Sequence, residues 1–265
     1  HFDAKIHLLH VRALYNDPNI DSEFLDEIER VLSTAEPSTR LALERIGKDG
    51  DTPIRAHIKR GFSAAQTIID AVAEYDCDLV IMGTHGRSGL KRLLAGSVAQ
   101  EVVHHSPVPV LTTRSQAEGA LSPHNILVAV DFSETSLKAV DWAAGMAEVL
   151  DAEITLLHVV EPFVYPDLYA LDSPSELYLE QILKNCHKGL SDIAADADTD
   201  VPISSAVINS HVAQGISSYA EKNDYDLVVL ATRGLSGLSH AVLGSVAERV
   251  VRLSSVPVLT VRGTS

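Results

Sequence analysis

One internal repeat constrains this chain more than any other feature of its sequence. Residues 83–98, GTHGRSGLKRLLAGSV, recur 148 positions later as residues 231–246, ATRGLSGLSHAVLGSV. Residues 3–11, DAKIHLLHV, recur at the same offset as DAEITLLHV, and Val108–Arg114 recurs as Val256–Arg262. The alignment needs no gap between residues 3 and 114. We therefore predict two copies of one fold in a single chain.

The hydropathy pattern of each copy alternates short apolar runs with amphipathic segments. This alternation is typical of an α/β domain in which helices cover both faces of a parallel sheet. We expect strands at Lys5–Val11, Ile54–Lys59, Cys77–Met82, Val108–Thr113, Asn125–Val130, Glu153–Val160, Val201–Val207, Tyr225–Leu230 and Val256–Arg262. We expect helices at Asp21–Ile46 with a break at Pro37, Ser63–Tyr75, Val98–His105, Ser133–Leu150, Ser175–Ala195, Val212–Glu221 and Ser245–Leu253.

The two copies differ at their beginnings. The second starts with a strand and helix, Asn125–Leu150, that have no counterpart in the first. In a doubly wound five-stranded sheet of order 3-2-1-4-5 the missing strand is the central one, and its loss leaves two buried strands without a partner. We expect either about 25–30 further residues upstream or a strand supplied by another chain. The predicted domains are 1–115 and 124–265, joined by a linker at 116–123.

Composition limits the possible partners. The formal net charge of −15 argues against nucleic-acid binding, which selects basic surfaces. No apolar run approaches the roughly 20 residues that a membrane-spanning helix needs. The two cysteines, Cys77 and Cys186, fit no metal or redox spacing and indicate a reducing compartment. We expect a cytoplasmic protein with no nucleic-acid or membrane partner.

The repeated glycine-rich loop is the candidate site. In the first copy an apolar run ending at Met82 leads into Gly83, and a short helix opens on Gly96-Ser97. Backbone amides at a helix start carry a partial positive charge, and glycines let the backbone approach a phosphate. The loop has neither the Walker A sequence nor the dinucleotide-binding glycine spacing. It predicts an anion site of another kind.

These loops, with Ile126–Ser133 and the Leu-Leu-His-Val strands, resemble the universal stress protein family. The family's nucleotide motif is Gly-x2-Gly-x9-Gly-Ser/Thr, which the first copy matches completely and the second matches except for Ala231. The resemblance implies a stress-related role, binding of ATP, ADP or AMP, with Mg²⁺, and pairing through the last strand. That pairing would be a homodimer or an internal pseudo-dimer through Val108–Thr113 and Val256–Arg262.

The resemblance also implies a set of nucleotide-binding residues. Asp131 would lie near the base and ribose, Val11 and Val159 would offer backbone groups beside the base, and the glycines would surround the phosphates. The full predicted set is Val11, Met82, Gly83, His85, Gly86, Arg87, Gly96, Ser97, Val98, Ala129, Val130, Asp131, Val159, Leu230, Ala231, Gly234, Gly244, Ser245 and Val246.

Each copy lacks one part of this set. The first has the intact motif and the loop cations Arg87, Lys91 and Arg92, but its aspartate would lie in the absent segment. The second has Asp131, but Ala231 adds a methyl group, and Leu235, Ser239 and His240 replace the three cations. We expect the first copy to be the better polyphosphate site once its upstream strand is present, and the second copy to bind weakly or to be structural.

Several polar residues have a structural interpretation beside the functional one. His10 and His158 fit packed histidines at the sheet rim, and His104-His105 fits a surface pair without a metal. Ser133 followed by Glu134 fits a helix N-cap. We expect no catalytic residue, and the hypotheses are a nucleotide-binding regulatory protein, a slow ATP hydrolase, or a scaffold that acts without nucleotide.

Overall fold

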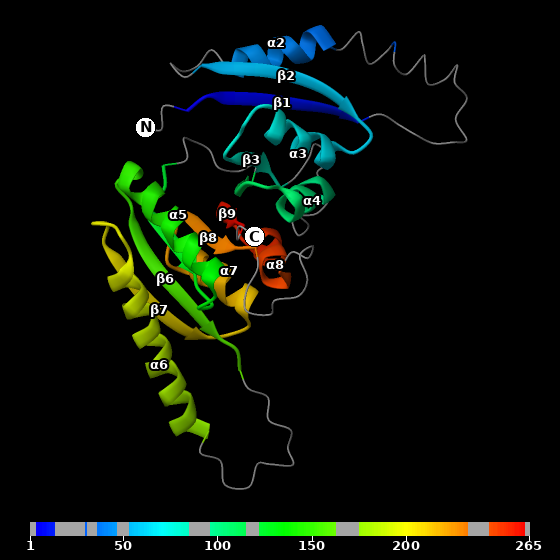
Figure 1. Ribbon diagram of the computed structural model, residues 1–265. Helices are drawn as coiled ribbons and strands as arrows, with labels where there is room; N and C mark the ends of the chain where they lie inside the picture. Colours follow the sequence, from blue (N-terminus) through cyan, green and yellow to red (C-terminus); the bar gives the residue numbers. More distant parts are fainter. Residues whose placement is uncertain are drawn as a thin grey trace, which may run out of the picture. The chain divides into compact units, whose positions relative to one another are not determined.

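The computed structural model describes residues 4–13, 30, 36–46, 53–84, 96–114, 122–162, 175–232 and 244–262. The chain divides into two compact units, residues 1–77 and residues 78–265 (Figure 1). This division differs from the predicted domain limits, because the second unit includes part of the first repeat. Each unit is described by itself.

The second unit contains a seven-stranded sheet in the order β3-β4-β9-β8-β5-β6-β7. Within the second repeat, the order β7-β6-β5-β8-β9 is the predicted 3-2-1-4-5 arrangement, with all four neighbouring pairs parallel. The strands are β3 (Val80–Gly83), β4 (Val110–Thr113), β5 (Asn125–Ala129), β6 (Glu153–Val160), β7 (Ile203–Asn209), β8 (Leu227–Ala231) and β9 (Val258–Val261).

Helices cover both faces of the second repeat's sheet, as predicted. One hydrophobic cluster joins the sheet to α5 (Glu134–Leu150) and α6 (Ser175–Asp196). A second cluster joins the other face to α7 (Val212–Lys222) and α8 (Ser245–Leu253). Strands buried on both faces explain the continuous apolar runs of the sequence. None of the helices in the described part of the chain has the length and apolar character needed to cross a membrane.

The two repeats join through their last strands. β4 pairs antiparallel with β9, with Leu111 opposite Leu259. The predicted C-terminal strands therefore pair with each other. They begin at Val110 and Val258, directly after a proline and two residues later than predicted. The hydroxyls of Thr112 and Thr260 donate across the junction to the carbonyls of Val258 and Val110, at 3.1 and 3.2 Å.

Two arginines reinforce this junction reciprocally. Arg114, which follows β4, donates to the carbonyl of Arg252 in the last turn of α8 at 2.7 Å. Arg262, which follows β9, donates to the carbonyls of His105 and Ser106 at the end of α4 (Ser97–His105), at 3.3 and 3.0 Å. Carbonyls at a helix C-terminus lack intrahelical partners and attract cations. Each repeat thus stabilises a helix end of the other.

The strands of the first repeat do not form one sheet. β3 and β4 extend the seven-stranded sheet, whereas β1 (Ile6–Ala13) and β2 (Ile54–Gly61) form a separate two-stranded parallel sheet in the first unit. In the order 3-2-1-4-5, removal of strand 1 leaves the pairs 3-2 and 4-5, which are the pairs observed. Among the described residues of the first repeat no strand lies between these two pairs, and they belong to separate sheets.

In the first unit, α2 (Glu36–Ile46) packs on β2, and α3 (Ala64–Glu74) packs on both strands. The hydroxyl of Ser63 caps α3 by accepting from the amide of Gln66 at 3.2 Å, as the sequence predicted. Pro37 lies in the first turn of α2, where proline is tolerated. The remainder of the predicted helix Asp21–Ile46, Arg30 apart, lies outside the described residues.

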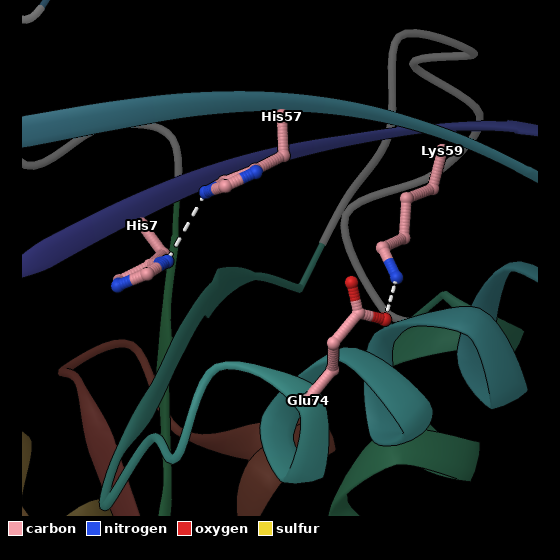
Figure 2. Close-up of polar contacts among 4 residues, drawn as sticks. All are labelled: His7, His57, Lys59 and Glu74. Carbon is pink, nitrogen blue, oxygen red and sulfur yellow. Dashed lines mark hydrogen bonds and ion pairs between the residues drawn. The ribbon is translucent and has the colours of Figure 1, made fainter.

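A polar cluster links the elements of the first unit (Figure 2). His7 on β1 and His57 on β2 are joined by a 3.1 Å hydrogen bond between Nδ1 and Nε2, and Lys59 on β2 forms an ion pair with Glu74 on α3. The ring of Tyr75 stacks on both imidazoles, with centroid distances of 4.9 and 4.2 Å. Sequence analysis did not predict this cluster, because it depends on the pairing of β1 with β2.

The strand registers correct the prediction that the repeat needs no gap. Ile6 lies opposite Ile54, and the corresponding Ile154 lies opposite Ile203. The equivalent residues Ile6 and Ile154 are 148 positions apart, whereas Ile54 and Ile203 are 149 positions apart. The N-caps of α3 and α7, Ser63 and His211, return to the 148 offset. The first repeat therefore has one extra residue between its second strand and the following helix.

Candidate functional site

A cavity of about 370 Å³ lies at the carboxyl ends of the central strands of the second repeat. This is the point at which the strand order reverses, with β6 on one side of β5 and β8 on the other. Ligands of open α/β sheets bind at this point. The lining residues are Ala129, Val130, Asp131, Ser136, Leu157, His158, Val159, Glu161, Val212, Ile216, Leu230, Ala231, Thr232, Gly244, Ser245, Val246 and Ala247.

The ends of the glycine-rich loop are fixed in the same way in both repeats. Thr232, after β8, donates its amide to the carbonyl of Val261 at 2.8 Å, and Gly244 donates to the carbonyl of Thr232 at 2.7 Å. In the first repeat, the amides of Thr84 and Gly96 make the equivalent bonds at 2.9 and 2.6 Å. The repeated sequence therefore encodes a repeated local geometry. The loop interiors, 85–95 and 233–243, lie outside the described residues.

The start of α8 forms one wall of the cavity. Gly244 is its N-cap, in an extended conformation, and provides no side chain to cap the helix amides. Ser245, Val246 and Ala247 follow it along the cavity wall. An uncapped helix start offers backbone N–H groups and the positive end of the helix dipole, which together favour an anionic group. α4 begins in the same way at Gly96.

The glycine at the start of α4 permits a close approach of the backbone. A Cβ atom built on Gly96 would lie 3.3 Å from the carbonyl oxygen of Thr84. This oxygen is the one that accepts the Gly96 amide. A larger residue at this position would push against the hydrogen bond that closes the loop. The glycine of the Gly-Ser pair thus has a structural reason as well as a predicted ligand-binding role.

Asp131 forms a second wall, directly after β5. Its Oδ1 accepts hydrogen bonds from the amide and hydroxyl of Ser133, at 3.1 and 2.5 Å. The Ser133 hydroxyl also accepts from the amide of Ser136 at 3.2 Å, so the predicted N-cap of α5 is confirmed. Phe132 between them has a φ of 64°, a left-handed conformation that makes the turn. The turn holds the carboxylate against the cavity.

His158 combines both interpretations that the sequence allowed. Its Nδ1 lies 2.7 Å from the carbonyl oxygen of Val130. Because a carbonyl oxygen only accepts, Nδ1 carries the hydrogen. Its ring lies 4.6 Å from the ring of Phe132, which explains its packed position, yet His158 also lines the cavity. It was predicted as a packed histidine and was not included among the site residues.

The cavity gathers the second-repeat residues that the sequence predicted, as far as the structure describes them. The lining set includes Ala129, Val130, Asp131, Val159, Leu230, Ala231, Gly244, Ser245 and Val246. Gly234 lies outside the described residues. The set also includes residues that sequence reasoning missed, among them Glu161, Thr232, Val212 and Ile216. The last two lie on α7, whose position at the cavity follows only from the crossover between β7 and β8.

The predicted residues of the first repeat are distributed between the two units. Val11 lies on β1 in the first unit. Met82 and Gly83 end β3, and Gly96, Ser97 and Val98 begin α4, all in the second unit. His85, Gly86 and Arg87 lie outside the described residues. Their roles in binding stay predictions.

Acidic groups dominate the charge of the described lining of the second-repeat cavity. Asp131 and the exposed Glu161 line it, and none of its described lining residues is a lysine or an arginine. Among the residues that the structure describes, no group of three or more His, Cys, Asp or Glu side chains could hold a metal ion. The arrangement can bind a small polar molecule that has an anionic end at α8 and hydroxyl groups at Asp131.

Comparisons with known proteins agree with the repeat and the fold. The universal stress protein family matches residues 1–114 and again residues 123–262. A universal stress protein of Mycobacterium tuberculosis is 27% identical over 244 residues, which cover 89% of this chain and 77% of that protein. One from Methanocaldococcus jannaschii is 33% identical over 138 residues, which cover 52% of this chain and 81% of that protein.

A solved structure shows the same architecture. The crystal structure of a universal stress protein from Archaeoglobus fulgidus superposes with a TM-score of 0.63 and 22% sequence identity. The superposition covers 97% of this chain and 87% of that one. This likeness supports the fold, and the two family matches confirm the tandem organisation predicted from the sequence.

Proposed function

Because this chain belongs to the universal stress protein family, we propose that it is an adenine-nucleotide-binding regulatory protein with a binding site in the cavity of its second repeat. One observation carries the proposal. A single cavity joins a carboxylate, Asp131, to the uncapped start of α8 at the switch point of the sheet. A carboxylate suits ribose hydroxyls, and helix amides suit phosphate.

In this proposal each wall of the cavity has one task. Asp131 accepts from the ribose hydroxyls, and the backbone of Val159 lies beside the base. The amides at Ser245 and Val246 hold the phosphate. The apolar side chains of Leu157 and Leu230 also line the cavity and exclude water from the nucleoside. The volume of about 370 Å³ lies within the range of small-molecule sites.

We propose binding without turnover. One oxygen of Asp131 already accepts two hydrogen bonds from Ser133, which makes it a poor base for activating water. Neither Cys77 nor Cys186 forms a disulfide, which fits the proposed cytoplasmic location. The pairing of β4 with β9 supports an internal pseudo-dimer, because it occupies the strand edges that a homodimer would use.

Isothermal titration of the full chain with AMP tests the site. Asp131→Ala should weaken AMP binding at least tenfold, since a charge-assisted hydrogen bond contributes about 1.5–3 kcal/mol. Asp141→Ala, the same change on the exposed side of α5, should leave the affinity within about twofold. Because Asp131 also holds a turn, circular dichroism must show the variant folded, and Ala129→Leu tests the cavity independently by filling it.

The same preparations separate the alternatives. Absence of binding to adenosine, AMP, ADP and ATP would contradict the proposal and favour a scaffold that acts without nucleotide. Steady release of phosphate from ATP that is lost in Asp131→Ala would favour a slow hydrolase. Binding without phosphate release supports the regulatory function.

A further inference from the structure

We propose that the cavity of the second repeat selects adenosine or an adenosine monophosphate over ATP. This inference rests on the proposed function and names the ligand class of the same site. Its basis is the charge of the cavity wall, the composition of the loop that follows β8, and the size of the cavity.

The described residues of the cavity wall carry more negative than positive charge. Asp131 and Glu161 contribute two carboxylates, from the ends of β5 and β6. The start of α8 contributes roughly half a positive charge, through its amides. No described lining residue is a lysine or an arginine. One phosphate group at α8 is compatible with this balance, whereas each further phosphate adds negative charge with no described cation to offset it.

The sequence of the adjoining loop points in the same direction. Residues 85–95 of the first repeat, HGRSGLKRLLA, contain Arg87, Lys91 and Arg92. The equivalent residues 233–243, RGLSGLSHAVL, contain Arg233 as their only arginine or lysine. The second loop therefore has one arginine where the first has two arginines and a lysine, and such cations form the strong charge-assisted hydrogen bonds to phosphate groups. The net charge of −15 adds a long-range field that opposes polyanions.

The size of the cavity agrees with a small ligand. Its volume of about 370 Å³ lies near the lower end of the 300–1,000 Å³ typical of small-molecule sites. A nucleoside with at most one phosphate fits such a space with its phosphate at α8.

The position of Glu161 allows a test that acts on charge alone. It is exposed at the end of β6, so a substitution there leaves the core unchanged. Glu161→Lys replaces a negative charge at the cavity rim with a positive one. Glu153→Lys makes the same change at the opposite end of β6, where the side chain is also exposed. The second variant is the matched control, because a strand of this length separates it from the cavity by more than a Debye length.

Titrations of the full chain with adenosine, AMP and ATP, each in EDTA, give the readout. Only the part of the binding that Asp131→Ala removes is assigned to the second repeat. We expect AMP and adenosine to bind at least tenfold more tightly than ATP in that part. Glu161→Lys should improve ATP affinity about tenfold and leave adenosine within twofold, whereas Glu153→Lys should change neither.

Two failures are distinguishable. ATP binding that depends on Asp131, is tighter than AMP binding and is unaffected by Glu161→Lys would overturn the charge selection and leave the proposed nucleotide site intact. Absence of Asp131-dependent binding of any of the three ligands would overturn the proposed site, and the selection with it.

Discussion

Two nearly identical strands of this chain end in very different environments. β6 and β1 share the pattern Ile-x-Leu-Leu-His-Val, yet Ile154 is 1% exposed and the equivalent Ile6 is 38% exposed. β6 lies between β5 and β7, whereas β1 pairs with β2 alone among the strands of the described residues. An apolar sequence therefore allows a strand to be buried, but whether it is buried depends on the strands that pair with it.

The next pair of equivalent strands shows the same contrast. Val229 in β8 is fully buried between β5 and β9, and the equivalent Ile81 in β3 is 65% exposed. β3 forms an edge of the seven-stranded sheet. In both comparisons the better-buried strand pairs with β5, the central strand that has no described counterpart in the first repeat. The central strand thus determines the burial of its two neighbours.

The largest expected effect comes from placing a charge at the two equivalent positions of β8 and β3. Val229→Lys buries an ammonium group without a partner and should cost more than about 4 kcal/mol, enough to unfold the second repeat. Ile81→Lys should cost less than about 1 kcal/mol, because the side chain reaches water. Thermal melts followed by circular dichroism measure both. Equal destabilisation would show that Ile81 is covered in solution.

Truncation of equivalent leucines gives a graded version of the same comparison. Leu156→Ala in β6 removes a fully buried side chain and should lower the free energy of unfolding by about 2–5 kcal/mol. Leu8→Ala in β1 removes a half-buried one and should cost clearly less. Urea titration combined with peptide-resolved hydrogen exchange assigns each loss to its unit. A larger loss for Leu8→Ala would contradict our account of the central strand.

The arginines at the junction extend the comparison to features that both repeats retain. Arg262→Ala removes hydrogen bonds to two carbonyls and should destabilise the end of α4 by roughly 1–3 kcal/mol. Arg114→Ala removes one to α8 and should cost less. Exchange rates of amides in the last turns of α4 and α8 report each effect. If each substitution loosened only its own repeat's helix, reciprocal capping would be wrong.

The smallest effect is a pH dependence of the first unit. Burial, with the nearby His7 and Lys59, lowers the pKa of His57 below its usual 6.5, and Glu74 opposes this shift. The unfolded chain then binds more protons than the folded chain between the folded pKa and 6.5. The stability of the first unit should therefore decrease as the pH falls below about 6.5, until the folded pKa is passed.

Hydrogen exchange of β1 and β2 at pH 7.5 and 5.5 measures this change, after correction for the intrinsic exchange rates. His57→Gln should remove the part due to this group. The second repeat provides an internal control, because Thr155 and Ala206 occupy the positions of His7 and His57 in its paired strands. An equal loss of protection in β6 and β7 would show that the effect does not arise from His57.

Much of the second repeat was predictable from sequence. Its continuous apolar runs, the N-cap at Ser133 and the order of its strands follow from local patterns and one topological rule. The family resemblance, and not a local pattern, assigned Asp131 and Gly244 to one site, and both line the cavity. Glu161 and Ile216 were not predicted, because their place at the cavity depends on how the following segments cross the sheet.

The first repeat was harder to predict because its environment differs from that of its copy. The alignment without gaps hid the extra residue before α3. The sequences of β2 and β7 share so few identical residues that a shift of one position between them is hardly visible. The pair His7 and His57 lies 50 positions apart in sequence and meets only through the register of β1 with β2. Local patterns carry no information of this kind.

The antiparallel pairing of β4 with β9 has a geometric consequence for the two glycine-rich loops. β3 runs parallel to β4, and β8 runs parallel to β9, so β3 and β8 point in opposite directions. The strand ends that lead into the loops therefore emerge at opposite margins of one sheet. Two strands, β4 and β9, lie between β3 and β8, so any signal that passes through the sheet from one loop to the other crosses these two strands.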